Sequence, residues 1–305
     1  MRHVFIMDPL GSVKPWKDTT YFLMRACVER GHTVGYADPG WLSLRHDEPY
    51  SRIQWLDVRD DHDVPFTVLA DETVPLSRAD AVWLRTDPPF DRGYLYTTLL
   101  LDFLPPTTRV INRPQGVRDW NEKLAALAFP RYTPRTLVSN SVEEILAFAD
   151  RIGRITVKPV DGHGGKGIVF FSPGEDPSPL EAATRAGQHW VVSQEYLPAA
   201  REGDKRILLL QGDPLGSILR VHAEGVELNN LDQGGSAQPV DLTPRDREIC
   251  AELKPALVSR GIFFAGIDVI GGQLIEVNVT SPTGLQEMSR FAGESLHHRI
   301  ISALE

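Results

Sequence analysis

The chain has 305 residues, of which 42% are hydrophobic and 24% are charged, a composition typical of globular proteins with about two domains. Its formal net charge of −9 argues against a nucleic-acid partner, which would favour a basic surface. No run approaches the ~20 apolar residues of a membrane helix, and residues 1–11 lack a signal-peptide cleavage site. We therefore expect no membrane partner and a cytoplasmic location.

The first elements along the chain predict a parallel sheet. Residues 2–7 are typical of a strand, and residues 33–38 predict the next one. Between them, apolar positions recur at helical spacing, with Asp18 as the candidate N-cap and Gly31 as the candidate C-cap. A strand, a helix and a second strand in this order favour an α/β domain.

The next segments continue this domain to a boundary near residue 118. Residues 80–91 predict a buried strand that runs into a proline-rich turn, and residues 109–129 predict a short strand, a loop and a helix. Residues 59–64, "RDDHDV", are typical of a solvated loop. Cys27 and Cys250 lie far apart without metal-ligand spacing, so we expect two buried thiols and no disulfide framework.

From residue 133 the pattern changes to strand pairs and helices, which predicts an α+β part behind the α/β domain. The predicted strands lie at 133–139, 154–160, 167–172 and 189–198, in a pair within 204–223, and in a hairpin at 263–280 that turns at Gly271-Gly272. The predicted helices span 141–152, 243–261 and 295–305, and a loop is expected from about 222 to 238. His297 and His298, on the last helix, are expected at the surface.

The stretch "VKPVDGHGGKGIVF" joins two of these strands through a glycine-rich loop at 161–167. Glycines adopt positive φ at little cost, and successive exposed N–H groups can then form a concave anion site. Lys158, near the end of the first strand, would project into whatever the loop covers. A flexible hairpin turn with a solvated His163 is the alternative reading, since neither a Walker A motif nor a dinucleotide fingerprint is present.

Three oxygen-bearing side chains in "GIDVIGGQLIEVN" predict a divalent metal site. Glu276 and Asn278 are two apart on one predicted strand and therefore share a face. Asp268, on the preceding strand of the hairpin, can reach the same point. Carboxylate and amide oxygens suit Mg²⁺, with phosphate oxygens completing the shell. A solvated polar strand face is the alternative.

Cations and a connector in the same region favour a phosphorylated ligand. Residues 194–198, "QEYLP", combine polar and apolar groups that could contact a purine edge. Lys205 and Arg206 enter the following strand, and Arg220 lies on its expected partner. A guanidinium at that place could stabilise charge on a transferring phosphoryl group or a tetrahedral carbon, although each cation alone is typical of a surface.

These motifs, in this order and spacing, resemble the prokaryotic glutathione synthetases of the ATP-grasp superfamily over essentially the whole chain. The segments that carry the resemblance are "MDPLGSVKPWKDTTYFLM", "DPPFD", "NRPQGVRDWNEKL", "VKPVDGHGGKGI", "QEYLPA", "EGDKRIL", "LGSILRV" and "GIDVIGGQLIEVNVTSPTG". The resemblance implies an ATP-grasp fold with three parts: an N-terminal substrate-side domain at 1–118, a small lid subdomain at 119–190, and a C-terminal subdomain at 191–305 that holds the metal and substrate site.

The resemblance also assigns roles to individual residues. It implies ATP-binding roles for Lys123, Lys158, Gly162, Gly164, Gly165, Gly167, Gln194, Glu195, Tyr196, Leu197 and Asp204. It implies metal-binding roles for Asp268, Glu276 and Asn278, and catalytic roles for Lys158 and Arg220. Substrate-binding roles fall on Asp18, Arg85, Arg220, Ser281, Pro282 and Thr283.

The implied activity joins γ-glutamylcysteine and glycine at the expense of ATP, through an acyl phosphate, with Mg²⁺ or alternatively Mn²⁺. Phosphoryl transfer depends on positioning and charge neutralisation, which agrees with the lysines, the loop and the acidic triad. The resemblance further implies small-molecule partners and a homotetramer.

One segment departs from the family pattern and leaves alternatives open. Leu228-Asn229 and Asp232-Gln233 stand where family members usually carry an Arg-Gly pair and small residues. The arginine of the family pattern is therefore absent here, and the Asp232 carboxylate adds a negative charge nearby. Drift in a lid loop explains this, but a related amino-acid or peptide ligase with a changed substrate is a second reading. A nucleotide-binding sensor without catalysis is a third.

Overall fold

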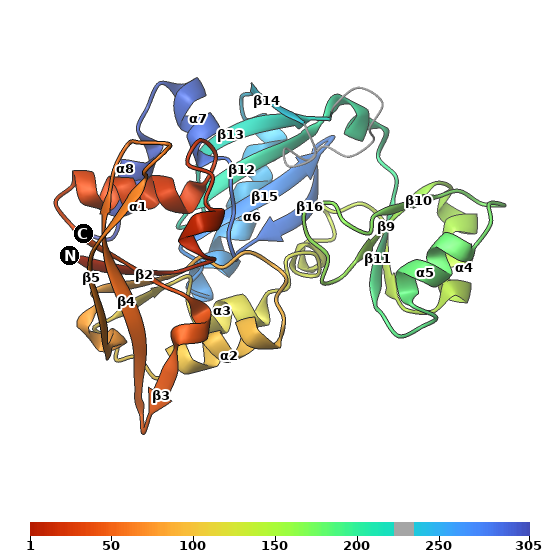
Figure 1. Ribbon diagram of the computed structural model, residues 1–305. Helices are drawn as coiled ribbons and strands as arrows, with labels where there is room; N and C mark the ends of the chain where they lie inside the picture. The colour runs from red at the N-terminus through yellow and green to blue at the C-terminus, as the bar shows by residue number, and fades with distance from the viewer. Residues whose placement is uncertain (223–234) are drawn as a thin grey trace.

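Three β-sheets organise the computed structural model, which describes residues 1–222 and 235–305 (Figure 1). The first sheet has the order β3-β4-β2-β1-β6-β7, with β5 paired to β4. Its strands are β1 Arg2–Ile6, β2 Thr33–Ala37, β3 Ser43–Arg45, β4 Glu48–Val58, β5 Phe66–Pro75, β6 Ala81–Leu84 and β7 Arg109–Ile111. The pairs β1–β2, β1–β6 and β6–β7 are parallel, so the predicted parallel sheet is confirmed.

The sequence patterns missed the antiparallel extension of this sheet. Strand β4 pairs antiparallel with β2, β3 and β5. Residues 67–73 of β5 are exposed, so this edge strand lacks the alternation of buried and exposed positions that would have indicated it. The charged residues 59–64 form the exposed loop between β4 and β5, as predicted.

Three helices accompany the first sheet: α1 Thr19–Glu29, α2 Arg92–Leu101 and α3 Pro114–Asp119. The predicted cap of α1 is confirmed, because the Asp18 carboxylate accepts a hydrogen bond from the Tyr21 N–H at 2.8 Å. Helix α2 was not predicted. The helix expected within 109–129 is the short α3, followed by a 3-10 turn at Ala125–Ala128.

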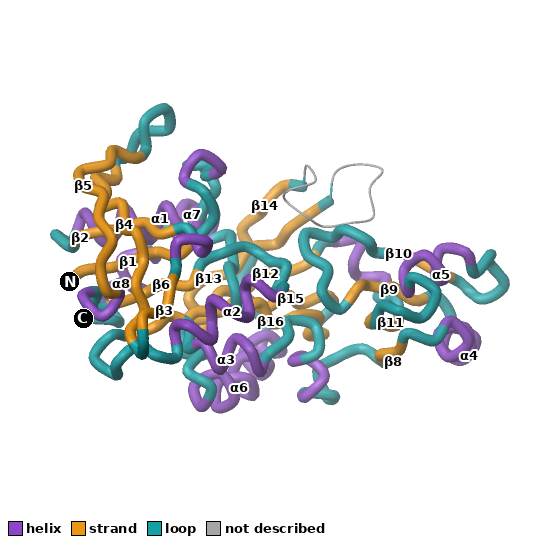
Figure 2. Tube along the Cα trace, turned by 60° about the horizontal axis from the view of Figure 1, so that its bottom comes forward, coloured by secondary structure: helices purple, strands orange, loops and turns teal. Residues whose placement is uncertain are grey.

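The second sheet, in the order β10-β9-β11-β8, forms its own layer with two helices at the opposite end of the molecule from the first sheet (Figures 1 and 2). It contains β8 Thr136–Ser139, β9 Ile155–Pro159, β10 Val169–Phe171 and β11 Val191–Glu195, covered by α4 Val142–Ile152 and α5 Ser178–Thr184. Ile145 and Phe148 pack on Ile155, Val157 and Leu180 in its small core. The predicted hairpin is confirmed, because β9 and β10 pair antiparallel on either side of the glycine loop.

The third sheet has the order β14-β13-β12-β15-β16 and lies between the other two (Figure 1). Its strands are β12 Asp204–Leu210, β13 Asp213–Val221, β14 Ser236–Pro239, β15 Phe264–Ile270 and β16 Gln273–Asn278. Helices α6 Pro244–Ser259, α7 Leu285–Ala292 and α8 Leu296–Ser302 accompany it. Both predicted strand pairs are confirmed, whereas the loop expected at 222–238 was partly wrong, since Ser236–Pro239 pairs with β13.

Helix α8 returns the end of the chain to the first sheet, where it packs on α1. This packing buries His297, whose ring stacks on Phe22 with the centroids 3.8 Å apart. The expectation that His297 lies at the surface was therefore wrong, whereas His298 is half-buried and bonds to Glu29 at 2.9 Å. Cys27 and Cys250 are buried free thiols, as expected. Within the described ranges, no helix is long and apolar enough to cross a membrane.

Candidate functional site

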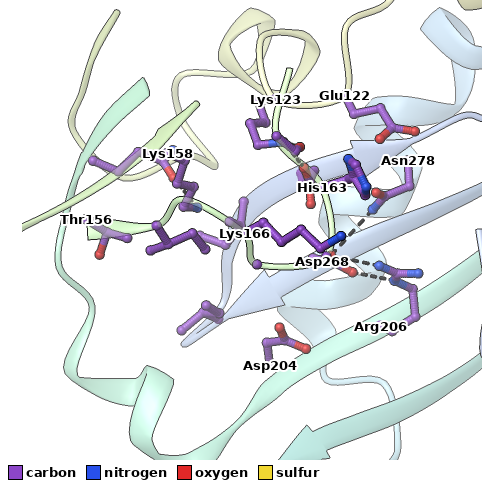
Figure 3. A pocket seen from close by; sticks show the side chains of 18 of the residues that line it. Glu122, Lys123, Thr156, Lys158, His163, Lys166, Asp204, Arg206, Asp268 and Asn278 are labelled. Carbon is purple, nitrogen blue, oxygen red and sulfur yellow. Dashed lines mark hydrogen bonds and ion pairs between the residues drawn. The ribbon is translucent and has the colours of Figure 1, made fainter. Parts of the chain in front are cut away.

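A cavity of about 310 Å³ lies between the second and third sheets, within the size range of small-molecule sites. The glycine loop and strands β9 and β10 form one wall, and strands β12, β13, β15 and β16 form the other (Figure 3). Its lining combines cations and carboxylates near the third sheet with the apolar side chains Ile168, Phe170, Tyr196, Leu197 and Ile275. A charged ligand with a flat apolar part therefore fits the cavity.

Two lysines line the cavity, and one of them connects the glycine loop to the third sheet. Lys123 donates to the backbone carbonyl of Gly162 and forms an ion pair with Glu276 at 3.0 Å. Lys158, on β9, donates to the Gln194 side-chain oxygen at 2.9 Å. Burial lowers the pKa of Lys158 below its ordinary value, although Glu276 opposes this shift. Both ammonium groups are therefore placed to neutralise the negative charge of phosphates bound in the cavity.

The glycine loop folds over the cavity through residues with positive φ. Gly164, Gly165 and Gly167 have φ values of 61°, 75° and 73°, a conformation that L-residues with side chains seldom adopt. Gly162, Gly164 and Gly165 line the cavity, as does His163. Gly167 does not belong to the lining, because it turns the chain back into β10 beside Pro159.

The end of β11 and the connector that follows it supply the apolar end of the cavity. Gln194, Glu195, Tyr196 and Leu197 all line it. The Glu195 carboxylate is held by Arg135 through two bonds of 2.9 and 2.7 Å. The Tyr196 ring makes an edge contact with Phe170, at a centroid distance of 5.8 Å. The two rings and the polar side chains of Gln194 and Glu195 lie together at this end of the cavity, a combination that suits a flat, partly polar ligand.

Asp268, Glu276 and Asn278 meet on one face of the β15–β16 hairpin. Asp268 pairs directly with Glu276 across the two strands, and the Asn278 amide nitrogen lies 3.4 Å from a carboxylate oxygen of Asp268. Carboxylate and amide oxygens gathered in this way are a donor set for a hard divalent cation. The predicted convergence of the three residues is therefore present in the structure, and Figure 3 shows two of them, Asp268 and Asn278, in contact.

Two arginines surround Asp268. Arg206 binds both of its carboxylate oxygens, the second at 2.9 Å, and Arg220 lies 2.9 Å from the same oxygen. Burial would raise the pKa of Asp268, but the two guanidinium groups outweigh it and hold that pKa well below the usual range. Asp204 accepts from Arg220 at 2.5 Å. Burial, with repulsion from Asp268, raises the pKa of Asp204 to about 6.

The predicted substrate-side residues fall into two groups. Ser281, Pro282 and Thr283 line the cavity, whereas Asp18 and Arg85 do not. Arg85 is buried behind the wall, where it donates to the Pro282 carbonyl oxygen at 3.1 Å. Asp18 caps α1, and its backbone oxygen accepts from Gln286 on α7 at 2.8 Å. The structure thus places these two residues as supports of the wall.

Arg206 and Glu122 are among the lining residues that received no role from the sequence patterns. Arg206 was considered only as a cation entering a strand, yet it is buried and holds Asp268. Glu122 accepts hydrogen bonds from the Val279 and Thr280 N–H groups at 3.0 and 3.2 Å, and from the Thr280 hydroxyl at 2.8 Å. It therefore fixes the start of the 281–283 turn. Its place beside Lys123 in "NEKL" was the available sequence signal.

Comparisons with known proteins identify the family. The model of the prokaryotic glutathione synthetase N-terminal domain matches residues 1–118, and the model of the ATP-grasp domain of the same family matches residues 122–293. The glutathione synthetases of Synechococcus elongatus and Bradyrhizobium diazoefficiens are 43% and 39% identical to this chain. The alignments cover 100% and 98% of this chain and 98% and 96% of the relatives. The chain belongs to the prokaryotic glutathione synthetase family.

Solved structures agree on the fold. The D-cycloserine synthetase DcsG matches with a TM-score of 0.67 at 18% identity, covering 100% of both chains. A RimK domain protein ATP-grasp from Sphaerobacter thermophilus matches with a TM-score of 0.64 at 17% identity, covering 100% of this chain and 99% of the other. The chain has the ATP-grasp fold. Leu228-Asn229 and Asp232-Gln233 lie outside the described residues.

Proposed function

We propose that this member of the prokaryotic glutathione synthetase family joins γ-glutamylcysteine and glycine in an ATP-dependent reaction that yields glutathione, ADP and phosphate. The relatives named glutathione synthetase, aligned over essentially the whole chain, support this activity. The main structural support is that two lysines, the glycine loop and the triad Asp268, Glu276 and Asn278 all line one cavity. Phosphoryl transfer needs this combination of positioning and charge neutralisation.

The proposed reaction proceeds in two steps. A carboxylate oxygen of γ-glutamylcysteine attacks the γ-phosphorus of ATP, and the bond to the β-phosphate oxygen breaks to release ADP. The glycine nitrogen then attacks the acyl-phosphate carbon, phosphate leaves with the C–O bonding pair, and the nitrogen gives up a proton. Because the acyl phosphate is open to hydrolysis, the glycine loop at 161–167 would exclude water from it.

Each part of the cavity has a proposed role in this reaction. Lys123, Lys158 and the loop N–H groups would hold the phosphates, while residues 194–197 and the Phe170 ring would hold the adenine. Asp204 would lie toward the ribose. Arg220 would neutralise charge at the reacting carboxylate, beside the turn at 281–283. These assignments are supported by the lining of the cavity and by the charges on it.

A divalent cation fits the acidic triad, and we propose Mg²⁺, with Mn²⁺ as an alternative. The low pKa of Asp268 keeps its carboxylate ionised, and ionised carboxylates are the ligands that hard cations prefer. Asp268, Glu276 and Asn278 would hold the ion. When bound, it would neutralise the charge of the β- and γ-phosphates.

The test is ADP release from the purified chain supplied with ATP, Mg²⁺, γ-glutamylcysteine and glycine, with glutathione identified by mass spectrometry. Glu276→Gln should lower kcat about 100-fold or more, because it removes the negative charge of one proposed ligand of the metal ion that would neutralise the phosphates. The matched control is Glu294→Gln, at an exposed position after α7, which should leave kcat within about twofold.

Two outcomes would favour the alternative functions. Turnover with a different carboxylate and amine, but none with γ-glutamylcysteine and glycine, would indicate a related amino-acid or peptide ligase. ATP binding without turnover for any pair would indicate a nucleotide-binding sensor. The three-part division at residues 118 and 190, the cytoplasmic location and the homotetramer remain expectations. Limited proteolysis would test the division, cell fractionation the location and light scattering the tetramer.

A further inference from the structure

The N-terminal domain contributes one charged side chain to the cavity. Of the described residues up to 118, those that line it are Asp87 and Pro88. Asp87 follows β6, at the carboxyl end of a strand in the parallel part of the first sheet, where open α/β sheets bind their ligands. Its backbone N–H donates to the Asp8 carboxylate at 2.8 Å. Asp8 follows β1, so two neighbouring parallel strands fix the position of Asp87.

Asp87 belongs to the substrate side of the cavity. Two residues before it, the buried Arg85 donates to the carbonyl oxygen of Pro282. Pro282 and Thr283 line the same cavity as Asp87. The nucleotide side is formed by the second sheet and by β16, whereas Asp87 enters from the first sheet. Arg85 thus ties the segment that carries Asp87 to the 281–283 turn, at the part of the cavity to which the first sheet contributes.

Each of the other carboxylates of the described lining has a charged or backbone partner. Their partners are the Arg135 guanidinium for Glu195, Arg220 for Asp204, Arg206 and Arg220 for Asp268, Lys123 for Glu276, and the backbone at 279–280 for Glu122. Asp87 is a further carboxylate of the lining, and its charge acts on the buried Arg85 guanidinium, whose pKa it helps to raise against the effect of burial. Its proximity also helps to raise the pKa of Asp8, for which burial is the larger cause.

We propose that Asp87 binds the α-ammonium group of the γ-glutamyl part of the dipeptide substrate, an inference that rests on the proposed function. γ-Glutamylcysteine carries two carboxylates and one ammonium group. The lysines and arginines of the cavity suit its carboxylates and would repel its ammonium group. The Asp87 carboxylate supplies the complementary charge through a charge-assisted hydrogen bond.

The glycine substrate is a poorer match for Asp87. Its nitrogen must lose its proton and offer a lone pair to the acyl phosphate, and an ion pair with a carboxylate would stabilise the protonated form. The ammonium group of the dipeptide stays protonated throughout the reaction. A permanent ion pair at Asp87 therefore anchors the dipeptide without opposing the chemistry.

The test compares γ-glutamylcysteine with glutarylcysteine, the same molecule without the α-ammonium group, at saturating ATP and glycine. For the wild-type protein, kcat/KM should be about 10- to 100-fold lower with glutarylcysteine, the effect of losing one hydrogen bond between charged groups. Asp87→Asn should lower kcat/KM for γ-glutamylcysteine by a similar factor and leave that for glutarylcysteine within about twofold. Asp87→Glu, which keeps the negative charge, should retain part of the preference for γ-glutamylcysteine over glutarylcysteine.

Matched controls separate this role from a structural one. Asp91→Asn alters another aspartate of the same "DPPFD" segment, which caps α2 by accepting from the Tyr94 N–H, and asparagine caps equally well. It should keep the full preference for the ammonium group. In Asp87→Asn the KM for ATP and the thermal midpoint should match the wild type.

Other results would overturn the assignment. If Asp87→Asn lowers kcat/KM equally for both dipeptides, or raises the KM of glycine alone, Asp87 does not bind the α-ammonium group. If the wild-type protein fails to use γ-glutamylcysteine with glycine at all, the proposed function itself fails, and this result is distinct from the first two.

Discussion

Asn112 links the first sheet to the strands that carry the acidic triad, and its removal should strongly destabilise the chain. The side chain is buried. Its amide nitrogen donates to the carbonyl oxygens of Phe264 and Val279 at 2.7 and 2.8 Å. Its oxygen accepts from the N–H groups of Phe263 and Phe264, both at 2.8 Å. One side chain thus satisfies four backbone groups, at the beginning of β15 and just after β16.

Asn112→Ala should lower the free energy of unfolding by about 4 kcal/mol, from about 1 kcal/mol for each of the four hydrogen bonds. Urea unfolding followed by tryptophan fluorescence measures this loss. Asn140→Ala is the control, because the Asn140 side chain donates a single bond, to the Gly187 carbonyl oxygen, and its loss should cost about 1 kcal/mol or less. A loss below about 1.5 kcal/mol for Asn112→Ala would refute the additive reasoning from the four contacts.

Three further substitutions test the charges and backbone of the cavity. Because burial lowers the pKa of Lys158, its ammonium group should lose its charge as the pH rises through that lowered value, and kcat/KM for ATP should fall there. Lys158→Arg, which stays charged, should move that fall to higher pH, and an unchanged profile would contradict the assignment. Gly203 has φ +122, and a Cβ atom there would lie 2.6 Å from the Arg220 carbonyl oxygen, so Gly203→Ala should cost about 1–3 kcal/mol of stability in thermal unfolding; an unchanged midpoint would refute this. Arg206→Met removes the bidentate partner of the buried Asp268 and should lower the free energy of unfolding in urea by about 3–5 kcal/mol. A loss under about 1 kcal/mol would show that Arg220 alone compensates the buried charge of Asp268.

Local patterns predicted those parts of the site that lie within one hairpin. The β9–β10 pair with its glycines and the β15–β16 pair with its double-glycine turn are each close in sequence. Strand alternation therefore sufficed to place Glu276 and Asn278 on one face. The residues that sequence reasoning placed less well act through distant partners. Arg85 bonds to the Pro282 carbonyl, 197 positions later, and the chain carries no local pattern for such a contact.

The charged face of the third sheet shows why the remaining contacts required the structure. Asp204 lies opposite Arg220 on β12 and β13, and Arg206 lies opposite Asp268 on β12 and β15. Asp268 in turn lies opposite Glu276. Directly opposed residues project from the same side of a sheet, as do residues two apart on one strand, so all five share one face. The pairing of β12 with β15 joins residues about 60 positions apart, and a shift by one residue would place Arg206 on the other face. The register of these two strands therefore determines the charge balance around the triad, and it is set by the packing of the whole domain.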